Sequence, residues 1–89
     1  MVQGYVAMCK VYILESVNRN YIYVGLTNNI ERRFAQHNAG RERTTRTYRP
    51  FKLIHFENFE SRPEAREREK YFKSGEGKEW IKGFILSRM

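Results

Sequence analysis

Glu69 is a carboxylate at a position where helical spacing predicts an apolar side chain. It follows Ala65 by four residues and precedes Phe72 by three, so a helix would turn all three toward one face. A charge on such a face has two explanations: it is a metal ligand, or it pairs with Arg66 or Lys73 at the edge of the apolar stripe. The sequence alone leaves both interpretations open.

Arg33 and His37 are a second polar pair, four residues apart in a predicted helix. They flank Ile30 and Phe34, so they share one side of that helix, close to its apolar stripe. Such a pair could grip a phosphate. A solvated arginine and a histidine packed in the core would show the same spacing, so the pair does not define a site by itself.

Tyr12, Tyr23 and Gly25 lie in predicted strands. Tyrosines in strands usually pack against their neighbours with the hydroxyl at the rim, and only some of them have a functional role. Gly25 ends the second strand, where the missing side chain allows the backbone to approach a substrate closely. None of the three residues identifies a reaction on its own.

Three runs rich in Val, Ile, Tyr and Phe predict β-strands over residues 6–14, 21–26 and 51–56. Polar residues 16–20 separate the first two runs, which predicts a β-hairpin. The first run is apolar on both alternating sets, with Lys10 as its only interior charge, as is typical of a central strand covered on two faces. In the third run, alternation places Phe51, Leu53 and His55 against Lys52, Ile54 and Phe56.

A helix and a basic loop are predicted between the second and third strands. Asn28 and Glu31 have the spacing of a capping box, and Gly40 stands where a helix over about residues 29–39 would end. The segment that follows is basic and without apolar periodicity, which predicts a loop. Its five cations are Arg41, Arg43, Arg46, Arg49 and Lys52.

Two more helices are predicted after the third strand. Ser61 and Glu64 form another capping-box pair, opening a helix that ends before Gly75. A last short helix is predicted over residues 80–86. The element order is therefore ββαβαα, which predicts an α+β fold with a small, mostly antiparallel three-stranded sheet flanked by helices.

Length and composition are consistent with one basic domain. We expect the 89 residues, 1–89, to form a single domain around one core. Seventeen Lys and Arg residues against ten Asp and Glu residues give a net charge of +7. A surplus of this size attracts polyanions, nucleic acid first, although acidic protein partners or solubility would explain it too.

Cysteine content and hydropathy predict the compartment. Cys9 is the only cysteine, so no internal disulfide can form, and a reducing cytoplasm fits. No signal-peptide pattern opens the chain, and no apolar run is long enough to span a bilayer. We therefore expect a soluble, cytoplasmic protein without a membrane partner.

The order and spacing of four motifs, taken together, resemble the GIY-YIG nuclease family. The motifs are Val-Tyr-Ile-Leu, Tyr-Val-Gly-Leu-Thr, Glu-Arg-Arg-Phe-Ala-Gln-His-Asn and Glu-Ala-x-x-x-Glu-x-x-x-Lys. The resemblance covers residues 5–80 and is closest to small stand-alone members related to the nuclease domain of the bacterial excision-repair subunit UvrC. Lys10 replaces the first glycine of the family name, and no asparagine follows Asn58, where many members present one near the metal.

The resemblance implies a divalent-metal-dependent DNA endonuclease that acts in repair or recombination. Glu69 would hold one Mg²⁺ or Mn²⁺ ion. Tyr12 would act as general base, with a pKa lowered from about 10 by the metal or by Arg33. Tyr23 would orient the water or the phosphate, Arg33 would stabilise developing charge, and His37 would support Tyr12 or accept the proton itself.

The resemblance also implies the partners. Substrate binding would involve Gly25 and the five cations of residues 41–52, with salt-sensitive contacts to the DNA backbone. Because so small a module binds DNA weakly, we also expect a protein partner that targets it. A second hypothesis is a non-catalytic nucleic-acid-binding or recruitment module that retains the nuclease fold. The sequence specifies neither the DNA structure nor the oligomeric state.

Overall fold

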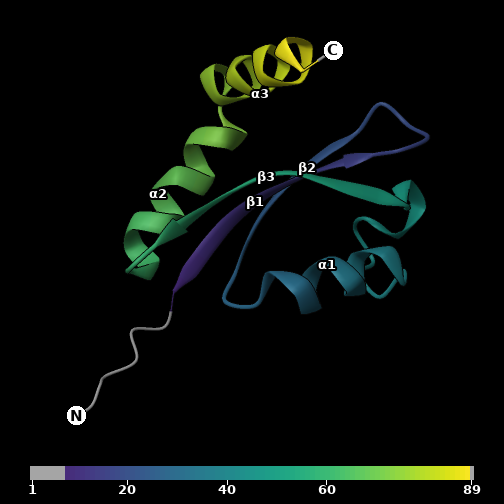
Figure 1. The fold of residues 1–89 in the computed structure, drawn as a ribbon, viewed down its shortest axis with the longest axis horizontal. Helices are drawn as coiled ribbons and strands as arrows, with labels where there is room; N and C mark the ends of the chain where they lie inside the picture. The colour runs from purple at the N-terminus through teal and green to yellow at the C-terminus, as the bar shows by residue number, and fades with distance from the viewer. Residues whose placement is uncertain (1–7, 89) are drawn as a thin grey trace.

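The fold is α+β with the predicted order ββαβαα. A computed structural model describes residues 8–88 (Figure 1). The strands are β1 (Cys9–Ser16), β2 (Ile22–Thr27) and β3 (Phe51–Phe59), and the helices are α1 (Ile30–Asn38), α2 (Arg62–Lys73) and α3 (Gly75–Ser87). The three strands form one sheet in the order β2-β1-β3, and both pairings are antiparallel. Within residues 8–88, no helix is long and apolar enough to cross a membrane.

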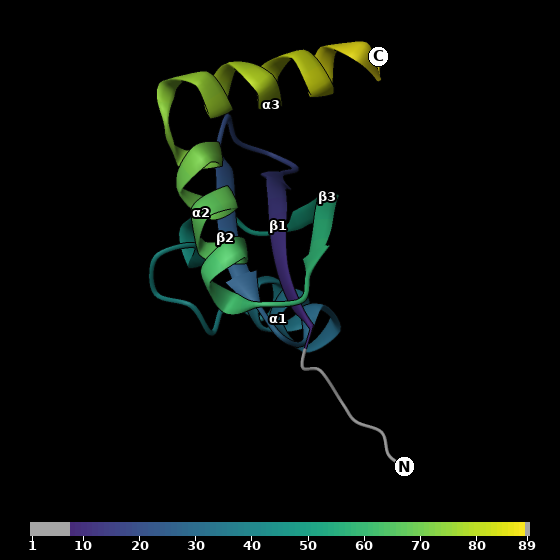
Figure 2. The ribbon, with the colours of Figure 1, turned by 90° about the vertical axis from the view of Figure 1, so that its left-hand side faces the viewer.

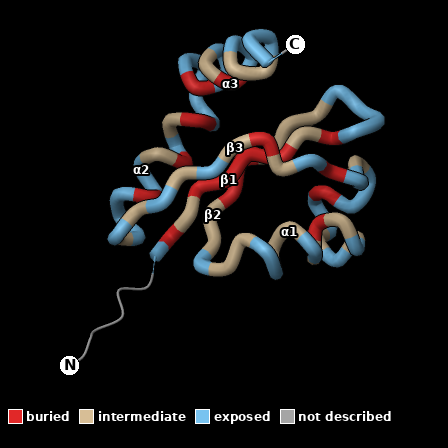
Figure 3. Tube along the Cα trace, in the orientation of Figure 1, coloured by how far each residue is buried: buried red, intermediate tan, exposed pale blue. Residues whose placement is uncertain are grey.

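β1 is the central strand, as its apolar sequence predicted. It pairs with both neighbours and is buried over most of its length (Figure 3). The strand begins at Cys9 and extends to Ser16, beyond the predicted end at residue 14. Residues 6 and 7, which were included in the prediction, lie outside the described part of the chain.

Alternate side chains of β1 divide the core between two layers of helix. Val11 and Ile13 face α2 and α3, where they pack with a cluster that includes Val24, Ala65, Phe72 and Ile81. Tyr12 and Leu14 face the opposite side, where Phe51, Ile30 and Phe34 cover them. Figures 1 and 2 show the result: α1 lies on one face of the sheet, while α2 runs beside β2 on the other.

A bulge in β3 changes the predicted alternation of that strand. Ile13 pairs with His55, but the next residue of β1, Leu14, pairs with Leu53, so β3 has one extra residue at this point. Because one extra residue moves every following side chain to the other face, His55 packs against Phe72 of α2 rather than on the side of Leu53. The prediction that placed His55 and Leu53 on one face is wrong for this reason.

All three predicted helices are present, but α1 and α3 begin at other residues than predicted. α1 is capped by Asn29, whose side chain accepts from the Arg32 amide at 3.1 Å, not by Asn28 as predicted. Gly40 follows the helix with a φ of +78°, the left-handed conformation expected at a helix end. Ser61 caps α2 as predicted: its hydroxyl oxygen accepts from the Glu64 amide at 3.4 Å, and the hydroxyl donates to the Glu64 carboxylate at 3.0 Å.

α3 begins earlier than the sequence predicted. Ser74 ends α2, and its hydroxyl oxygen also accepts from the amide of Gly77 at 3.2 Å, which caps α3. Gly75 therefore opens a helix directly after the end of α2, and α3 covers residues 75–87 instead of 80–86. The two helices join without a loop, so the angle between them depends on close contact at the junction.

Gly77 makes that contact, and its replacement tests the junction. A Cβ atom there would overlap the Tyr71 carbonyl oxygen and lie 2.5 Å from Cα of Phe72. Because backbone atoms cannot move aside, we expect Gly77→Ala to lower the free energy of unfolding by about 1–3 kcal/mol in urea denaturation. Gly83 of the same helix has open space around it, so Gly83→Ala should raise stability by roughly 0.5–1 kcal/mol. Equal effects of the two substitutions would contradict this account of the junction.

Candidate active site

A buried chain of hydrogen bonds links β1, α1 and the loop after α1. The hydroxyl of Tyr12 lies 2.9 Å from Nε2 of His37, and Nδ1 of His37 lies 2.8 Å from Oγ1 of Thr45. All three residues are 1% exposed or less, so water does not compete for these bonds. Three segments that are distant in sequence therefore meet through polar side chains inside the core.

The surroundings of Tyr12 allow us to assign the proton on His37. The Arg33 guanidinium lies beside the Tyr12 hydroxyl and can only donate hydrogen bonds. The Tyr12 hydroxyl therefore donates to Nε2, and the Nδ1–H group of the neutral imidazole donates to Thr45. In this tautomer the hydroxyl of Tyr12 and both ring nitrogens of His37 have partners.

Burial keeps both titratable members of this chain neutral. Burial raises the pKa of Tyr12 to about 12, and Arg33 offsets only part of that effect. Burial, helped by the positive charge of Arg33, lowers the pKa of His37 below its ordinary value. The expectation that cations would lower the pKa of Tyr12 is therefore wrong for the chain itself, because desolvation of the phenol outweighs the guanidinium.

Arg33 is the charged group next to this pair. Its Nη1 donates to Glu42 at 2.8 Å and to Gln36 at 3.2 Å. Burial opposes its charge, but Glu42 and Tyr12 outweigh burial and raise the pKa of Arg33 above its ordinary value. Its side chain is 29% exposed, whereas His37 is fully buried. Arg33 can therefore meet a phosphate and His37 cannot, so the predicted grip of one phosphate by both residues is wrong.

Gly25 faces Tyr12 across the pairing of β1 and β2. A Cβ atom at this glycine would overlap the Tyr12 hydroxyl oxygen and lie 2.5 Å from Cζ of the same ring. The close approach expected at Gly25 is therefore made by Tyr12, inside the protein. A larger residue would displace the hydroxyl from His37. Contact between Gly25 and a substrate stays a prediction.

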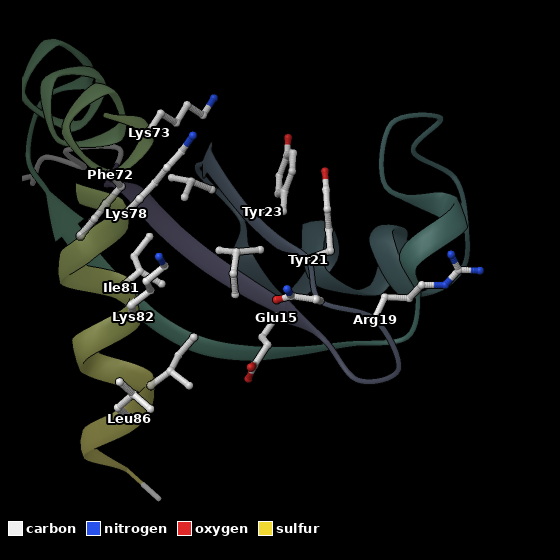
Figure 4. A pocket seen from close by; sticks show the side chains of 14 residues that line it. Glu15, Arg19, Tyr21, Tyr23, Phe72, Lys73, Lys78, Ile81, Lys82 and Leu86 are labelled. Carbon is white, nitrogen blue, oxygen red and sulfur yellow. The ribbon is translucent and has the colours of Figure 1, made fainter. Parts of the chain in front are cut away.

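Tyr23 connects the buried chain to the surface. Its ring centroid lies 4.9 Å from that of His37 and 6.1 Å from that of Tyr12. Together, Tyr12, Tyr23, Arg33, His37 and Thr45 form the tyrosine cluster. Tyr23 also lines an open groove of about 700 Å³, the β2–α3 groove, which is bounded by Tyr21 and Tyr23 on one side and by Phe72, Lys73 and Ile81 on the other (Figure 4).

Glu69 lies on α2, on the other face of the sheet from Tyr12. Its Oε1 is 3.4 Å from Nη1 of Arg66, and its Oε2 is 3.1 Å from Nζ of Lys73. The pairing that the sequence allowed is thus present, with both partners. No hydrogen bond or ion pair within residues 8–88 joins Glu69 to the tyrosine cluster. Four of the five predicted catalytic residues therefore lie in one cluster, and the fifth, Glu69, lies apart from it.

One side of α2 nevertheless follows the free edge of β2. Its polar members, spaced at intervals of four, three and four residues, are Arg62, Arg66, Glu69 and Lys73. Arg62 shares a shallow hollow with Arg33, and Lys73 shares the β2–α3 groove with Tyr23. β2 is an edge strand, so no strand of the described sheet lies beyond it. Glu69 is thus placed along the helix between two hollows that each contain a member of the tyrosine cluster.

A divalent cation would find one carboxylate at this edge. Among residues 8–88, no group of three His, Cys, Asp or Glu side chains could hold an ion. Mg²⁺ in enzymes often takes one or two carboxylates and completes its shell with water and substrate phosphate, so Glu69 fits that mode. The side chains of Arg66 and Lys73 are 52% and 55% exposed, which leaves them free to move away from the carboxylate.

The segment after α1 is a loop with one short 3₁₀ turn, Arg46–Tyr48. Its buried residue Thr45 fixes it to His37. The predicted DNA-binding cations all lie on the surface, and Lys52 of β3 pairs with Glu15 at 3.6 Å. The other four have no ion pair within the described chain: Arg41, Arg43, Arg46 and Arg49.

Two members of the site were not singled out from the sequence. Thr45 is one of several threonines in the loop, and nothing in their spacing marks it as the partner of His37. Glu42 is the single acid among the loop cations, which is a signal that it pairs with an arginine. The signal does not say which arginine, because the partner, Arg33, lies in the preceding helix.

The site brings together two strand tyrosines, a glycine packed against the ring of Tyr12, and a helical arginine and histidine. The GIY-YIG catalytic domain matches residues 8–82 of the chain. The chain therefore belongs to the GIY-YIG family, a superfamily of nucleases.

Several proteins of the UPF0213 group are similar to this chain. The UPF0213 protein lwe0147 of Listeria welshimeri is 51% identical over 63 residues, which are 70% of this chain and 69% of that protein. The UPF0213 protein CPE1444 of Clostridium perfringens is 45% identical over 67 residues, 74% and 71% of the two chains. The solution NMR structure of the UPF0213 protein BH0048 from Bacillus halodurans aligns with a TM-score of 0.52 and 33% identity, covering 85% of this chain and 83% of that one.

Replacing Thr45 tests the buried chain of hydrogen bonds. Thr45→Val keeps the shape of the side chain but leaves Nδ1–H of His37 without its acceptor, which should lower the free energy of unfolding by about 1–3 kcal/mol. Thr47 is exposed in the same loop, so Thr47→Val should change stability by less than about 0.5 kcal/mol. Urea denaturation at pH 7 measures both variants. A loss of the same size in the two variants would show that Nδ1 of His37 does not depend on Thr45.

Proposed function

We propose that this protein is a divalent-metal-dependent DNA endonuclease of the cytoplasm, active in repair or recombination, which a protein partner directs to its sites. The observation that carries the proposal is the free edge of β2. Groups from both faces of the sheet border this edge: Tyr23 and Arg33 from the tyrosine cluster, and the Glu69 side of α2. In this proposal one phosphate at the edge contacts groups from both faces.

Glu69 is the residue that would hold the cation. A bound Mg²⁺ or Mn²⁺ supplies charge neutralisation at the phosphate and lowers the pKa of coordinated water. In this proposal a substrate phosphate attracts Arg66 and Lys73 away from Glu69. The two cations then neutralise phosphate charge, and the carboxylate is left to the metal.

Tyr12 and His37 would move the proton of the attacking water. Because the pKa of Tyr12 is about 12, a tyrosinate is costly inside the core. A relay avoids it: the Tyr12 oxygen takes the proton of the water while its own proton passes to Nε2 of His37. The attacking water would approach the Tyr12 oxygen from the side of Arg33, whose side chain is partly exposed and lies beside the Tyr12 hydroxyl. The lowered pKa of His37 favours return of the proton after cleavage.

Two groups of the tyrosine cluster are left for the phosphate itself. Tyr23 reaches the surface at the β2–α3 groove and would orient the phosphate through its hydroxyl. Arg33 stays charged and is partly exposed, so it would stabilise the negative charge that develops on the phosphoryl oxygens. Both roles rest on position at the β2 edge and on the chemistry of the side chains.

The alternative is a nucleic-acid-binding or recruitment module without catalysis. Two observations favour it: both oxygens of Glu69 are paired with cations, and burial raises the pKa of Tyr12. In an enzyme, substrate binding would have to free Glu69 from its cations and let Tyr12 accept a proton. A binding module needs neither change.

Removal of the Glu69 charge separates the two functions. We expect wild-type protein to nick supercoiled DNA in the presence of Mg²⁺ or Mn²⁺, and we expect EDTA to abolish the nicking. Glu69→Gln should lower the nicking rate at least about 100-fold, because the metal loses its only proposed carboxylate. Glu67→Gln is the matched control, since Glu67 is an exposed carboxylate of the same helix that pairs with Lys70. DNA binding without nicking in the wild type, under every metal condition, would establish the binding module instead.

The basic loop predicts a salt-dependent affinity for DNA. Arg43 and Arg46 are exposed and have no ion pair within the described chain, so each can release a counterion from the DNA backbone. In Arg43→Gln/Arg46→Gln we expect the slope of log affinity against log salt to become shallower by about 2 in fluorescence anisotropy. Lys70→Gln on α2 should leave the slope unchanged. A slope that is the same in the double variant would remove the loop from the DNA interface.

A further inference from the structure

The β2–α3 groove combines an apolar floor with a cationic rim. Val24, Phe72 and Ile81 belong to the core cluster and form part of its lining. Figure 4 shows Tyr21 and Tyr23 rising from the β2 side, opposite Ile81 on α3. The volume of about 700 Å³ lies in the range of roughly 300–1,000 Å³ that is usual for sites of small organic ligands. The groove is thus large enough for planar rings.

The rim of the groove is strongly positive. Four cations line it: Arg19, Lys73, Lys78 and Lys82. Glu15 is the one acid in the lining, and it pairs with Lys52 of β3. Lys73 pairs with the buried carboxylate of Glu69 at 3.1 Å, whereas Lys82 pairs only with Glu79, at 3.5 Å between largely exposed groups, an interaction of little strength. Arg19 and Lys78 have no ion pair within residues 8–88. An anionic ligand can therefore engage Arg19, Lys78 and Lys82 without displacing a buried partner.

We propose that the β2–α3 groove binds an unpaired DNA strand next to the point of cleavage. Unpaired nucleotides carry flat, apolar-faced bases and one negative charge each, which match the floor and the rim. Stacking on aromatic side chains is how proteins hold such strands, and two tyrosines stand along one wall. The ring of Tyr21 is itself fixed by stacking on Tyr48, with centroids 3.8 Å apart. A rigid aromatic wall requires little ordering when a base binds.

The position of the groove connects it to the proposed nuclease site. Tyr23 belongs both to the tyrosine cluster and to the groove lining, and Lys73 contacts Glu69 and lines the groove. A strand that leaves the groove over the edge of β2 would thus bring its next phosphate to these residues. This step rests on the proposed function, and it names the substrate class: DNA with an unpaired segment beside the scissile bond, rather than a continuous duplex.

Two fluorescein-labelled DNAs test the groove without cleavage, in EDTA: a blunt duplex and the same duplex with an unpaired tail of about ten thymidines. Wild-type protein should bind the tailed DNA roughly tenfold more tightly in fluorescence anisotropy. Lys78→Gln/Lys82→Gln should reduce that preference to about threefold or less and leave the blunt duplex unaffected. Lys82→Gln has a close control in Lys70→Gln, because Lys70 and Glu67 form an equally exposed pair at the same 3.5 Å, outside the groove lining.

Crosslinking of the wild type keeps the test independent of variants. A tail that carries 5-iodouracil should crosslink to Tyr21 or Tyr23 on irradiation, as identified by mass spectrometry. Equal binding of the two DNAs, or crosslinks confined to residues 41–52, would overturn the proposal. So would a dimer in analytical ultracentrifugation that Lys78→Gln/Lys82→Gln dissociates, because a second copy would then occupy the groove.

The two proposals fail in different ways. Tail-dependent binding without nicking of any DNA would retain the groove and reject the nuclease. Metal-dependent nicking, abolished in Glu69→Gln, with equal binding and cutting of blunt and tailed DNA would retain the nuclease and reject the groove.

Discussion

The hydrogen bond between the hydroxyl of Tyr12 and Nε2 of His37 joins the central strand to the first helix inside the core. An unsatisfied hydrogen-bonding group in a buried polar pair costs free energy, so the neighbours of this pair are constrained as well. The remaining nitrogen of His37 requires Thr45, and this fixes the start of the basic loop. The ring of Tyr12 requires the empty space at Gly25, and this constrains β2. Strand, helix and loop are thus positioned by one small set of bonds.

The same set explains why the arginine of the site is ordered. Arg33 lies beside the Tyr12 hydroxyl, and Glu42 at the start of the loop binds it from the other side. Because the loop is fixed by Thr45, Glu42 has a defined position from which to bind Arg33. A guanidinium held in this way keeps its charge in spite of partial burial. Preorganised charge of this kind is what a site needs in order to stabilise an oxyanion without rearrangement.

Much of the fold followed from local patterns, because apolar runs and capping signals are local properties of a sequence. The order of elements, the central position of β1, the C-terminal ends of α1 and α2 and the start of α2 at Ser61 were predicted in this way. The bulge at Ile54 and the early start of α3 were not, because one depends on pairing with β1 and the other on Ser74 serving two helices. For the site, spacing identified the tyrosines, Arg33 and His37, but burial decides what they can do. Only the fold shows that His37 is out of reach of a phosphate.

The two faces of the sheet have different properties, and this difference shapes the proposed chemistry. On the α1 face the polar groups are buried, paired and neutral except for Arg33, so they can be positioned accurately but cannot attract a substrate by themselves. On the α2 side the cations are largely exposed and their ion pairs are weak, so they can attract a polyanion but do not hold a fixed geometry. The two properties are available to one ligand only where the faces meet. β2 is the edge at which they do so, because the helices on both sides border it and no strand covers it in the described sheet.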